Sequence, residues 1–177
     1  YNNQLTTLPD WLWSLTNLET LNVSVNRLTA LSPQIGQLAK LRMLDAAHNA
    51  ITTLPDAIGD LPALTDFLYL SDNGLTRLPD SLARLTRLRY LNVTDNALTA
   101  LPDNLGDMIG LIELRAYNNP LAILPDSIGA LTALRELHLD RTPLRALPES
   151  TGDLRALRVL SLRGCQIEAL PASLGEL

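Results

Sequence analysis

The chain has 177 residues, of which 46% are hydrophobic and 19% are charged, and its formal net charge at pH 7 is −5. This composition predicts one folded domain with a continuous core and excludes intrinsic disorder. The acidic balance supplies no basic field that gathers phosphate backbones, so nucleic acid is not an expected partner.

The chain contains a single cysteine, Cys165, and therefore cannot form an internal disulfide. Extracellular repeat domains are commonly stapled by disulfides, so we expect a reducing compartment and no disulfide-stabilised extracellular form. No run of residues approaches the roughly 20 apolar positions of a membrane-spanning helix. Residues 1–4 do not begin a signal peptide.

An apolar residue recurs at a nearly constant spacing along the whole chain, which is the signature of a repeat protein. Successive copies lie 23 residues apart, apart from one interval of 24. Three residues after each copy comes a leucine, which is followed by proline in every unit except the second, where Ser32 stands. The recurring positions are Leu5, Leu28, Ile51, Leu75, Leu98, Leu121, Leu144 and Ile167.

Residues 88–98 show the pattern of one unit, Leu-x-x-Leu-x-Leu-x-x-Asn-x-Leu. Period-two alternation predicts a short strand in which Leu91 and Val93 point inward while Tyr90 and Asn92 point outward. The segment that follows reads Leu-Pro-Asp-x-Ile/Leu-Gly-x-Leu. This segment predicts one or two turns of irregular helix. The proline fixes the backbone, the Asp is expected to cap the helix, and the glycine is expected to end it.

Stacked coils of this kind pair their strands in parallel, about 4.8 Å apart, and merge their inward leucines into one core. We therefore predict a single domain over residues 1–177 with about seven to eight coils. The chain starts within a unit and shows no polar cap, so we expect it to continue in a longer protein. Trp11 and Trp13 fall on the convex side, where they either pack against a preceding segment or cover the first coil.

One column of the repeat is occupied by asparagine, just after each predicted strand. A side-chain amide there can bond backbone groups of its own coil and of the adjacent coil, which predicts a structural ladder. Thr142 and Cys165 replace asparagine in the last two units, so the ladder should be looser there. One extra residue precedes Leu68 and predicts a local bulge or a wider turn near Phe67. The asparagines are Asn3, Asn26, Asn49, Asn73, Asn96 and Asn119.

Over its whole length the chain resembles the leucine-rich-repeat family, in particular the 23-residue intracellular class with Leu-Pro-x-x-Ile-Gly-x-Leu. The resemblance implies an α/β solenoid, a right-handed horseshoe with a parallel β-sheet on the concave face and short helical or 3-10 segments on the convex face. It also implies a protein-binding module without enzymatic activity or cofactors.

The basic residues are arginines except for Lys40, a usage typical of GC-rich bacteria. With this composition the repeats most resemble target-recognition domains of bacterial type III effectors, which bind a host protein. That resemblance implies a cytoplasmic protein, or one secreted into a host cell. The alternative is a regulatory repeat domain of a bacterial signalling protein linked to a GTPase or kinase.

The residues that carry chemistry give no support for an active site or a metal centre. His48 and His138 lie four coils apart, roughly 20 Å at strand spacing, and cannot share a metal ion. Cys165 falls in the ladder column, which favours a structural role. Asp72 and Asp95 occupy equivalent positions without a calcium-binding loop, so a solvated acidic patch is expected. No serine or cysteine nucleophile supports a catalytic triad.

The outward positions of the predicted strands form the candidate binding surface. Three of the four tyrosines fall there on consecutive coils, with Met43 on the N-terminal side. One interpretation is that the tyrosines are there only because tyrosine is a good strand former. The other is that they form a protein-binding patch, because exposed tyrosines are enriched at interface hot spots. Acidic side chains gather towards the N-terminal half and basic ones towards the C-terminal half, an arrangement that can orient a partner. The candidate residues are Met43, Tyr69, Asp72, Tyr90, Asp95, Arg115, Tyr117, His138, Arg141 and Arg163.

Overall fold

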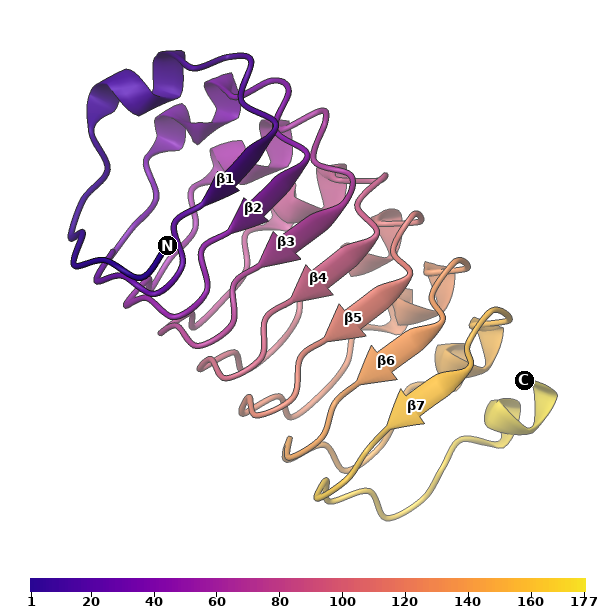
Figure 1. Ribbon diagram of the computed structural model, residues 1–177. Helices are drawn as coiled ribbons and strands as arrows, with labels where there is room; N and C mark the ends of the chain where they lie inside the picture. Colours follow the sequence, from indigo (N-terminus) through magenta and orange to yellow (C-terminus); the bar gives the residue numbers. More distant parts are fainter.

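The computed structural model describes residues 1–177, which form an open solenoid of stacked coils (Figure 1). Seven strands of three residues each form one parallel sheet in sequence order, so each strand pairs with those of the neighbouring coils. This arrangement confirms the predicted solenoid with its parallel sheet. The strands are β1 (Thr20–Asn22), β2 (Met43–Asp45), β3 (Phe67–Tyr69), β4 (Tyr90–Asn92), β5 (Glu113–Arg115), β6 (Glu136–His138) and β7 (Val159–Ser161).

The leucine at the centre of each strand sets the register of the sheet. Leu68 of β3 pairs with Leu44 on one side and with Leu91 on the other, and all three side chains are fully buried. Side chains alternate along a strand, so the first and third residues point away from the core. A slip of one residue would carry the leucines into solvent, and the repeat therefore fixes the register.

Short 3-10 helices form the opposite wall of the coils. Their brevity follows from the sequence, because a proline fixes the backbone just before most of them and each coil must return to the sheet within 23 residues. None of them has the length and apolarity that crossing a membrane requires. The helices are η1 (Asp10–Ser14), η2 (Pro33–Gln37), η3 (Asp56–Asp60), η4 (Asp80–Arg84), η5 (Leu105–Asp107), η6 (Asp126–Ala130), η7 (Glu149–Asp153) and η8 (Ala172–Glu176).

The expectation that aspartate caps these helices is wrong. In η3 the cap position is held by Pro55, and Asp56 is the first helical residue without a capping hydrogen bond. The only capping side chain is Ser32, whose Oγ accepts from the Gln34 N–H in the one unit that lacks the proline. The aspartates still lie in the first turn, where a negative charge is favourable near the exposed N–H groups.

The expectation that glycine stops each helix is also wrong, because the glycines lie inside the helices. A Cβ atom on Gly59 would lie 2.0 Å from the backbone oxygen of Ser81 in the next coil, and one on Gly106 would lie 2.2 Å from that of Ser127. Such distances are far inside van der Waals contact. Glycine at these two positions is therefore required for the close approach of the next helix.

Buried side chains from successive coils merge into a single core of 42 residues. Trp13 is only 1% exposed and belongs to this core, whereas Trp11 is 65% exposed. Trp13 therefore covers the core of the first coil, one of the two roles expected for the tryptophans. The indole of Trp11 faces solvent.

The asparagine ladder is confirmed. Asn96 Oδ1 accepts from the Leu75 N–H of the preceding coil at 3.0 Å, while its Nδ2 donates to backbone oxygens of both coils. The pattern weakens where asparagine is replaced, as predicted. Thr142 makes one backbone bond, to the Leu139 oxygen, and otherwise contacts the Cys165 sulfur at 3.3 Å.

The extra residue of the third coil widens a turn and leaves the strand intact. β3 pairs without interruption with both neighbours. The insertion falls at residues 65–66, where the Asp66 N–H donates to the Arg42 backbone oxygen and the Asp66 carboxylate lies 3.1 Å from the Arg42 guanidinium. Of the two sequence-based alternatives, the wider turn is the one observed.

Candidate functional site

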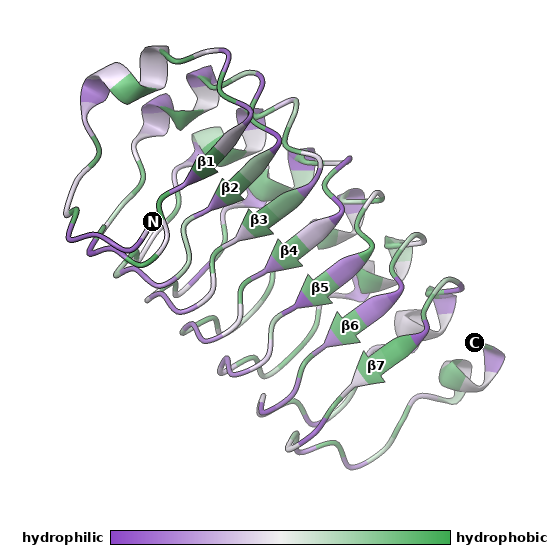
Figure 2. Cartoon of the chain, viewed as in Figure 1, coloured by the Kyte–Doolittle hydropathy of each residue, from purple (hydrophilic) through white to green (hydrophobic).

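The outward face of the sheet changes character along the solenoid. β3 and β7 begin with hydrophobic residues, whereas β5 and β6 begin with hydrophilic ones (Figure 2). The first outward column consists of Thr20, Met43, Phe67, Tyr90, Glu113, Glu136 and Val159. The second outward column consists of Asn22, Asp45, Tyr69, Asn92, Arg115, His138 and Ser161.

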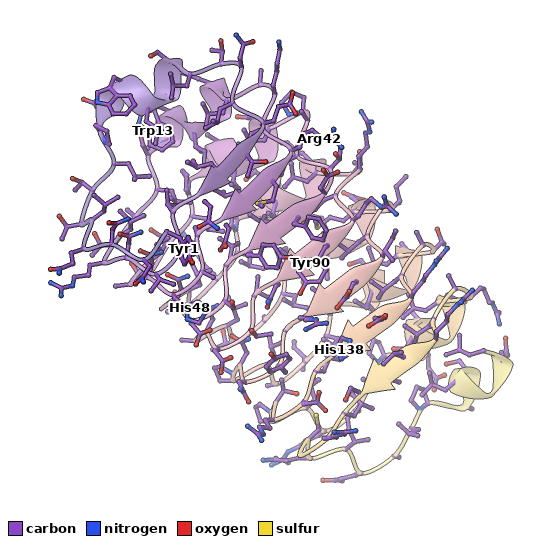
Figure 3. All side chains as sticks on the ribbon, in the orientation of Figure 1. Tyr1, Trp13, Arg42, His48, Tyr90 and His138 are labelled. Atoms are coloured by element: carbon purple, nitrogen blue, oxygen red, sulfur yellow. The ribbon has the colours of Figure 1, made fainter.

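Three aromatic side chains meet on β3 and β4, and we call Phe67, Tyr69 and Tyr90 the aromatic cluster. The ring centroids of Tyr69 and Tyr90 lie 5.1 Å apart, and those of Phe67 and Tyr90 lie 5.5 Å apart. Phe67 stacks on Tyr69 with centroids 5.7 Å apart and is 41% exposed. Figure 3 shows Tyr90 over the strands of the sheet, whereas Trp13 lies on the first helix at the N-terminal end.

Phe67 was missed as a binding residue by sequence reasoning. The signal was available, because Phe67 occupies the same outward position as Tyr90 in the neighbouring strand. Met43, a predicted binding residue, pairs with Phe67 across β2 and β3.

Arg115 extends the aromatic cluster towards the C-terminal half. Its guanidinium carbon lies 5.7 Å from the centroid of the Tyr90 ring, and its Nε donates to Glu113 Oε1 at 2.5 Å. Burial is the largest single effect and lowers the pKa of Arg115, but the hydrogen bond to Glu113 and the charge interactions with Tyr90, Glu113 and Tyr117 together raise the pKa overall. Burial raises the pKa of the Tyr90 phenol, and a smaller effect of Arg115 opposes it. The phenol and the guanidinium both keep their neutral-pH charge states.

Tyr117 lies away from the aromatic cluster. It follows the end of β5 by two residues and has no ring contact with Tyr69 or Tyr90. Instead it lines a pocket of about 280 Å³ together with Arg141 and Arg163. The three predicted tyrosines are therefore divided between two places on the same side of the molecule.

Three of the predicted charged residues lie on the turn that follows the strand. Asp72, Asp95 and Arg141 share one left-handed backbone position, with φ of 51°, 52° and 55°. The two aspartates have lateral partners on neighbouring coils: His48 lies 3.4 Å from Asp72, and Asn118 donates to Asp95 at 2.7 Å. These groups form a rim beside the sheet face.

Arg163 follows β7 on the same side as Tyr117. Its backbone N–H donates to Asp140 Oδ1 at 2.6 Å, and the Ser161 hydroxyl donates to the same oxygen. Burial is the largest single effect and raises the pKa of the Asp140 carboxyl, but these hydrogen bonds and the nearby Arg163 and His138 together hold the pKa below its usual range. Asp140 therefore remains an anion that fixes the backbone carrying Arg163.

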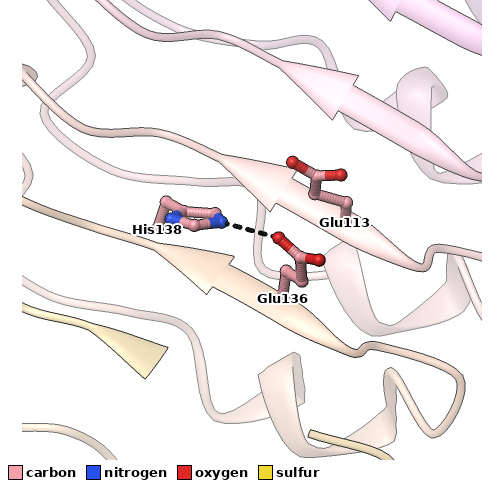
Figure 4. A group of neighbouring side chains, drawn as sticks. All are labelled: Glu113, Glu136 and His138. Carbon is pink, nitrogen blue, oxygen red and sulfur yellow. Dashed lines mark hydrogen bonds and ion pairs between the residues drawn. The ribbon is translucent and has the colours of Figure 1, made fainter. Parts of the chain in front are cut away.

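The structure brings together one group of potential metal ligands that the sequence analysis did not consider. Ligand atoms of Glu113, Glu136 and His138 all lie within 4.8 Å of one another (Figure 4). Glu113 pairs with Glu136 across β5 and β6, and His138 lies two residues beyond Glu136. Glutamates at the same outward position of adjacent units were the available signal.

A family model described as a leucine-rich repeat region matches residues 30–123, which is more than half of the chain. The chain belongs to the leucine-rich-repeat family. A second family model, described as Leucine Rich Repeat, matches residues 156–177. No curated protein sequence matches the chain.

Solved leucine-rich-repeat structures share this fold. A leucine-rich-repeat protein of Leptospira interrogans is 32% identical, with a TM-score of 0.94 over 99% of this chain and 45% of that protein. The ectodomain of the Arabidopsis thaliana receptor kinase GASSHO1/SCHENGEN3 is 30% identical, with a TM-score of 0.82 over 96% of this chain and 21% of its own. An internalin of Listeria monocytogenes, 23% identical with a TM-score of 0.79 over 94% of this chain and 47% of its own, shows the fold alone. The chain spans less than half the length of each.

Leucine-rich repeats form a protein–protein interaction module and typically carry no catalytic activity. The curvature of a solenoid presents an extended concave surface, which is the part of such proteins suited to a large partner. In this leucine-rich-repeat chain that surface carries the aromatic cluster, Arg115 and the group of Glu113, Glu136 and His138.

Proposed function

We propose that the concave face binds a partner protein, with the aromatic cluster at the centre of the interface. The observation that carries the proposal is the gathering of Phe67, Tyr69 and Tyr90, in mutual contact, on an outward sheet surface. The core does not need them there, because the central leucine of each strand already fills it.

The physical properties of the cluster suit an interface hot spot. Aromatic side chains bring a large contact area at a small cost in side-chain entropy, and tyrosine adds a polar tip. Tyr, Trp and Arg are the residues most enriched at hot spots, and Arg115 lies against Tyr90. A pocket of about 260 Å³ opens beside Phe67 and Tyr90, with Ile112 in its lining, and offers room for one side chain of a partner.

The proposed interface extends from this centre to the other candidate residues. Met43 continues the apolar surface towards the N terminus, and His138 lies on β6 beyond Arg115. Tyr117, Arg141 and Arg163 would contribute a basic rim at the C-terminal end. On the N-terminal side Asp72 and Asp95 would contribute an acidic rim. Such rims act more on the rate and orientation of association than on affinity.

We further propose that this module is the target-recognition part of a bacterial effector that acts on a host protein. The arginine-rich composition and the 23-residue repeat support this proposal. The competing function is regulation of a GTPase or kinase domain on the same polypeptide. The sequence of the flanking regions separates the two, because a secretion segment favours an effector and a nucleotide-binding loop favours a regulator.

The experiment compares the wild-type domain with Tyr90→Ala and Trp11→Ala as baits for affinity purification from a host-cell lysate. Trp11 is the matched control, since it is an exposed aromatic residue on the convex side. A protein retained by wild type and Trp11→Ala should bind Tyr90→Ala about thirtyfold more weakly, since a hot-spot alanine costs about 2 kcal/mol or more. Retention by Tyr90→Ala and loss by Trp11→Ala would show that the partner binds the convex face.

A further inference from the structure

We propose that Glu113, Glu136 and His138 form a binding site for a divalent transition-metal ion of the Zn²⁺ type. The site lies on the same concave face as the protein-binding surface proposed above and shares His138 with it, but metal binding does not depend on a partner protein. It requires only the side chains on the outward face of β5 and β6.

The sheet fixes the three side chains on one surface. Glu113 and Glu136 hold the same outward position of adjacent parallel strands and are paired in register. His138 is the next outward residue after Glu136 on β6. Because adjacent strands lie about 4.8 Å apart, the three Cβ atoms define a compact triangle whose shape does not depend on a flexible loop.

The distances between ligand atoms match a shared ion. Zn²⁺ binds nitrogen and oxygen at about 2.0 to 2.2 Å, so neighbouring ligand atoms in octahedral or tetrahedral geometry lie about 2.8 to 3.6 Å apart. His138 Nε2 and Glu136 Oε2 are already 3.1 Å apart (Figure 4). The carboxylate of Glu113 lies within 4.8 Å of both. Binding a shared ion would therefore require the Glu113 carboxylate to move closer to the other two ligands.

Electrostatics favours a cation at this point. Two carboxylates directly opposite each other on neighbouring strands repel. Arg115 offsets the charge of Glu113 through its Nε, and His138 approaches Glu136, so each glutamate has one partner on its own strand. An ion between the strands would satisfy both carboxylates together, while the Arg115 hydrogen bond would orient Glu113, as outer partners of metal ligands commonly do.

The donor set selects the class of metal. Imidazole with carboxylates suits Zn²⁺ and its first-row neighbours, whereas Ca²⁺ takes six to eight oxygen ligands and has little use for a histidine. Three protein ligands leave a coordination position open to solvent, as in sites that accept a further ligand. Side-chain exposures of 18% for Glu113 and 20% for His138 keep the site accessible without leaving these two ligands freely mobile.

The test is titration of the purified domain with Co²⁺, followed by its visible absorption, and with Zn²⁺ in competition. We expect one equivalent of Co²⁺ to bind per chain. Zn²⁺ should displace the bound Co²⁺, and Ca²⁺ should not compete with it. His138→Gln and Glu136→Gln should each weaken binding about tenfold or more. Two control variants, His48→Gln and Cys165→Ser, should bind as wild type does. Circular dichroism checks that each variant is folded. Equal binding by wild type and His138→Gln, or loss of binding in either control variant, would overturn the proposal.

Discussion

The rings of Tyr69 and Tyr90 lie with their centroids 5.1 Å apart and their planes at 50°, although the two residues occupy different outward columns of the sheet. The contact is diagonal across β3 and β4. Phe67, which precedes Tyr69 by two residues on β3 and pairs with Tyr90, contacts both rings. Contact among the three rings makes the cluster one surface. The two phenols of the cluster are partly buried, and this burial shifts their pKa values.

Burial raises the pKa of both phenols above the ordinary value of 10.0. A raised pKa in the folded state means that the associated stability is present below pH 10 and is lost as the pH rises through the folded-state pKa. We therefore expect tyrosinate absorbance of the folded domain to develop at higher pH than in guanidinium chloride. Tyr90→Phe should remove part of this late-titrating absorbance, and an identical titration curve for that variant would contradict the assignment to Tyr90.

Asn96→Ala should destabilise the domain more than Asn92→Ala. Asn96 joins two coils through four hydrogen bonds, including one from the Leu75 N–H. Asn92 accepts a single bond, from the Thr94 N–H of its own coil. An unpaired buried group costs about 1 to 3 kcal/mol, and chemical denaturation of both variants measures the difference. Equal free energies of unfolding would refute the ladder as a source of stability.

Gly59→Ala and Gly175→Ala form a matched pair at the same repeat position. The new Cβ atom would collide with the Ser81 backbone oxygen in the first variant and would meet nothing within 4 Å in the second. Overpacking of this kind typically costs about 1 to 3 kcal/mol. Gly175→Ala should be neutral or stabilising by a few tenths of a kcal/mol, because alanine restricts the unfolded chain. Melting temperatures test the order, and a more damaging Gly175→Ala would reverse our explanation of the glycines.

Trp13→Ala should lower stability far more than Trp11→Ala. Trp13 is enclosed in the core at the first coil, and truncation of a buried tryptophan typically costs about 3 to 5 kcal/mol. Trp11 is exposed, and surface substitutions usually change stability by less than about 0.5 kcal/mol. Intrinsic fluorescence gives a second measurement, since the variant that retains only Trp13 should emit at shorter wavelength. Red-shifted emission from Trp13 would show that it is solvated.

The sequence by itself determined the coil. Leucines at fixed spacing have one way to be buried together, and a register slip would expose them, so the parallel sheet and the positions of its strands could be predicted. The ladder could be predicted for a similar reason, because Asn96 is the one polar side chain of its unit placed to satisfy backbone groups of two coils. These features depend on interactions that recur in every unit.

Tertiary structure decided the features that depend on the distance between coils. The repeat shows a recurring glycine, but only the packing of successive helices explains why Gly59 has no side chain: a Cβ atom there would collide with the backbone of Ser81. Likewise, the sequence marked Tyr69 and Tyr90 as outward residues and said nothing of their contact with Phe67. Residues about 23 positions apart come within 6 Å only when the sheet stacks the coils, and the same stacking brings Glu113 to Glu136. A periodic pattern specifies the face on which a side chain lies, while its neighbours on that face depend on side-chain conformations that the pattern does not encode.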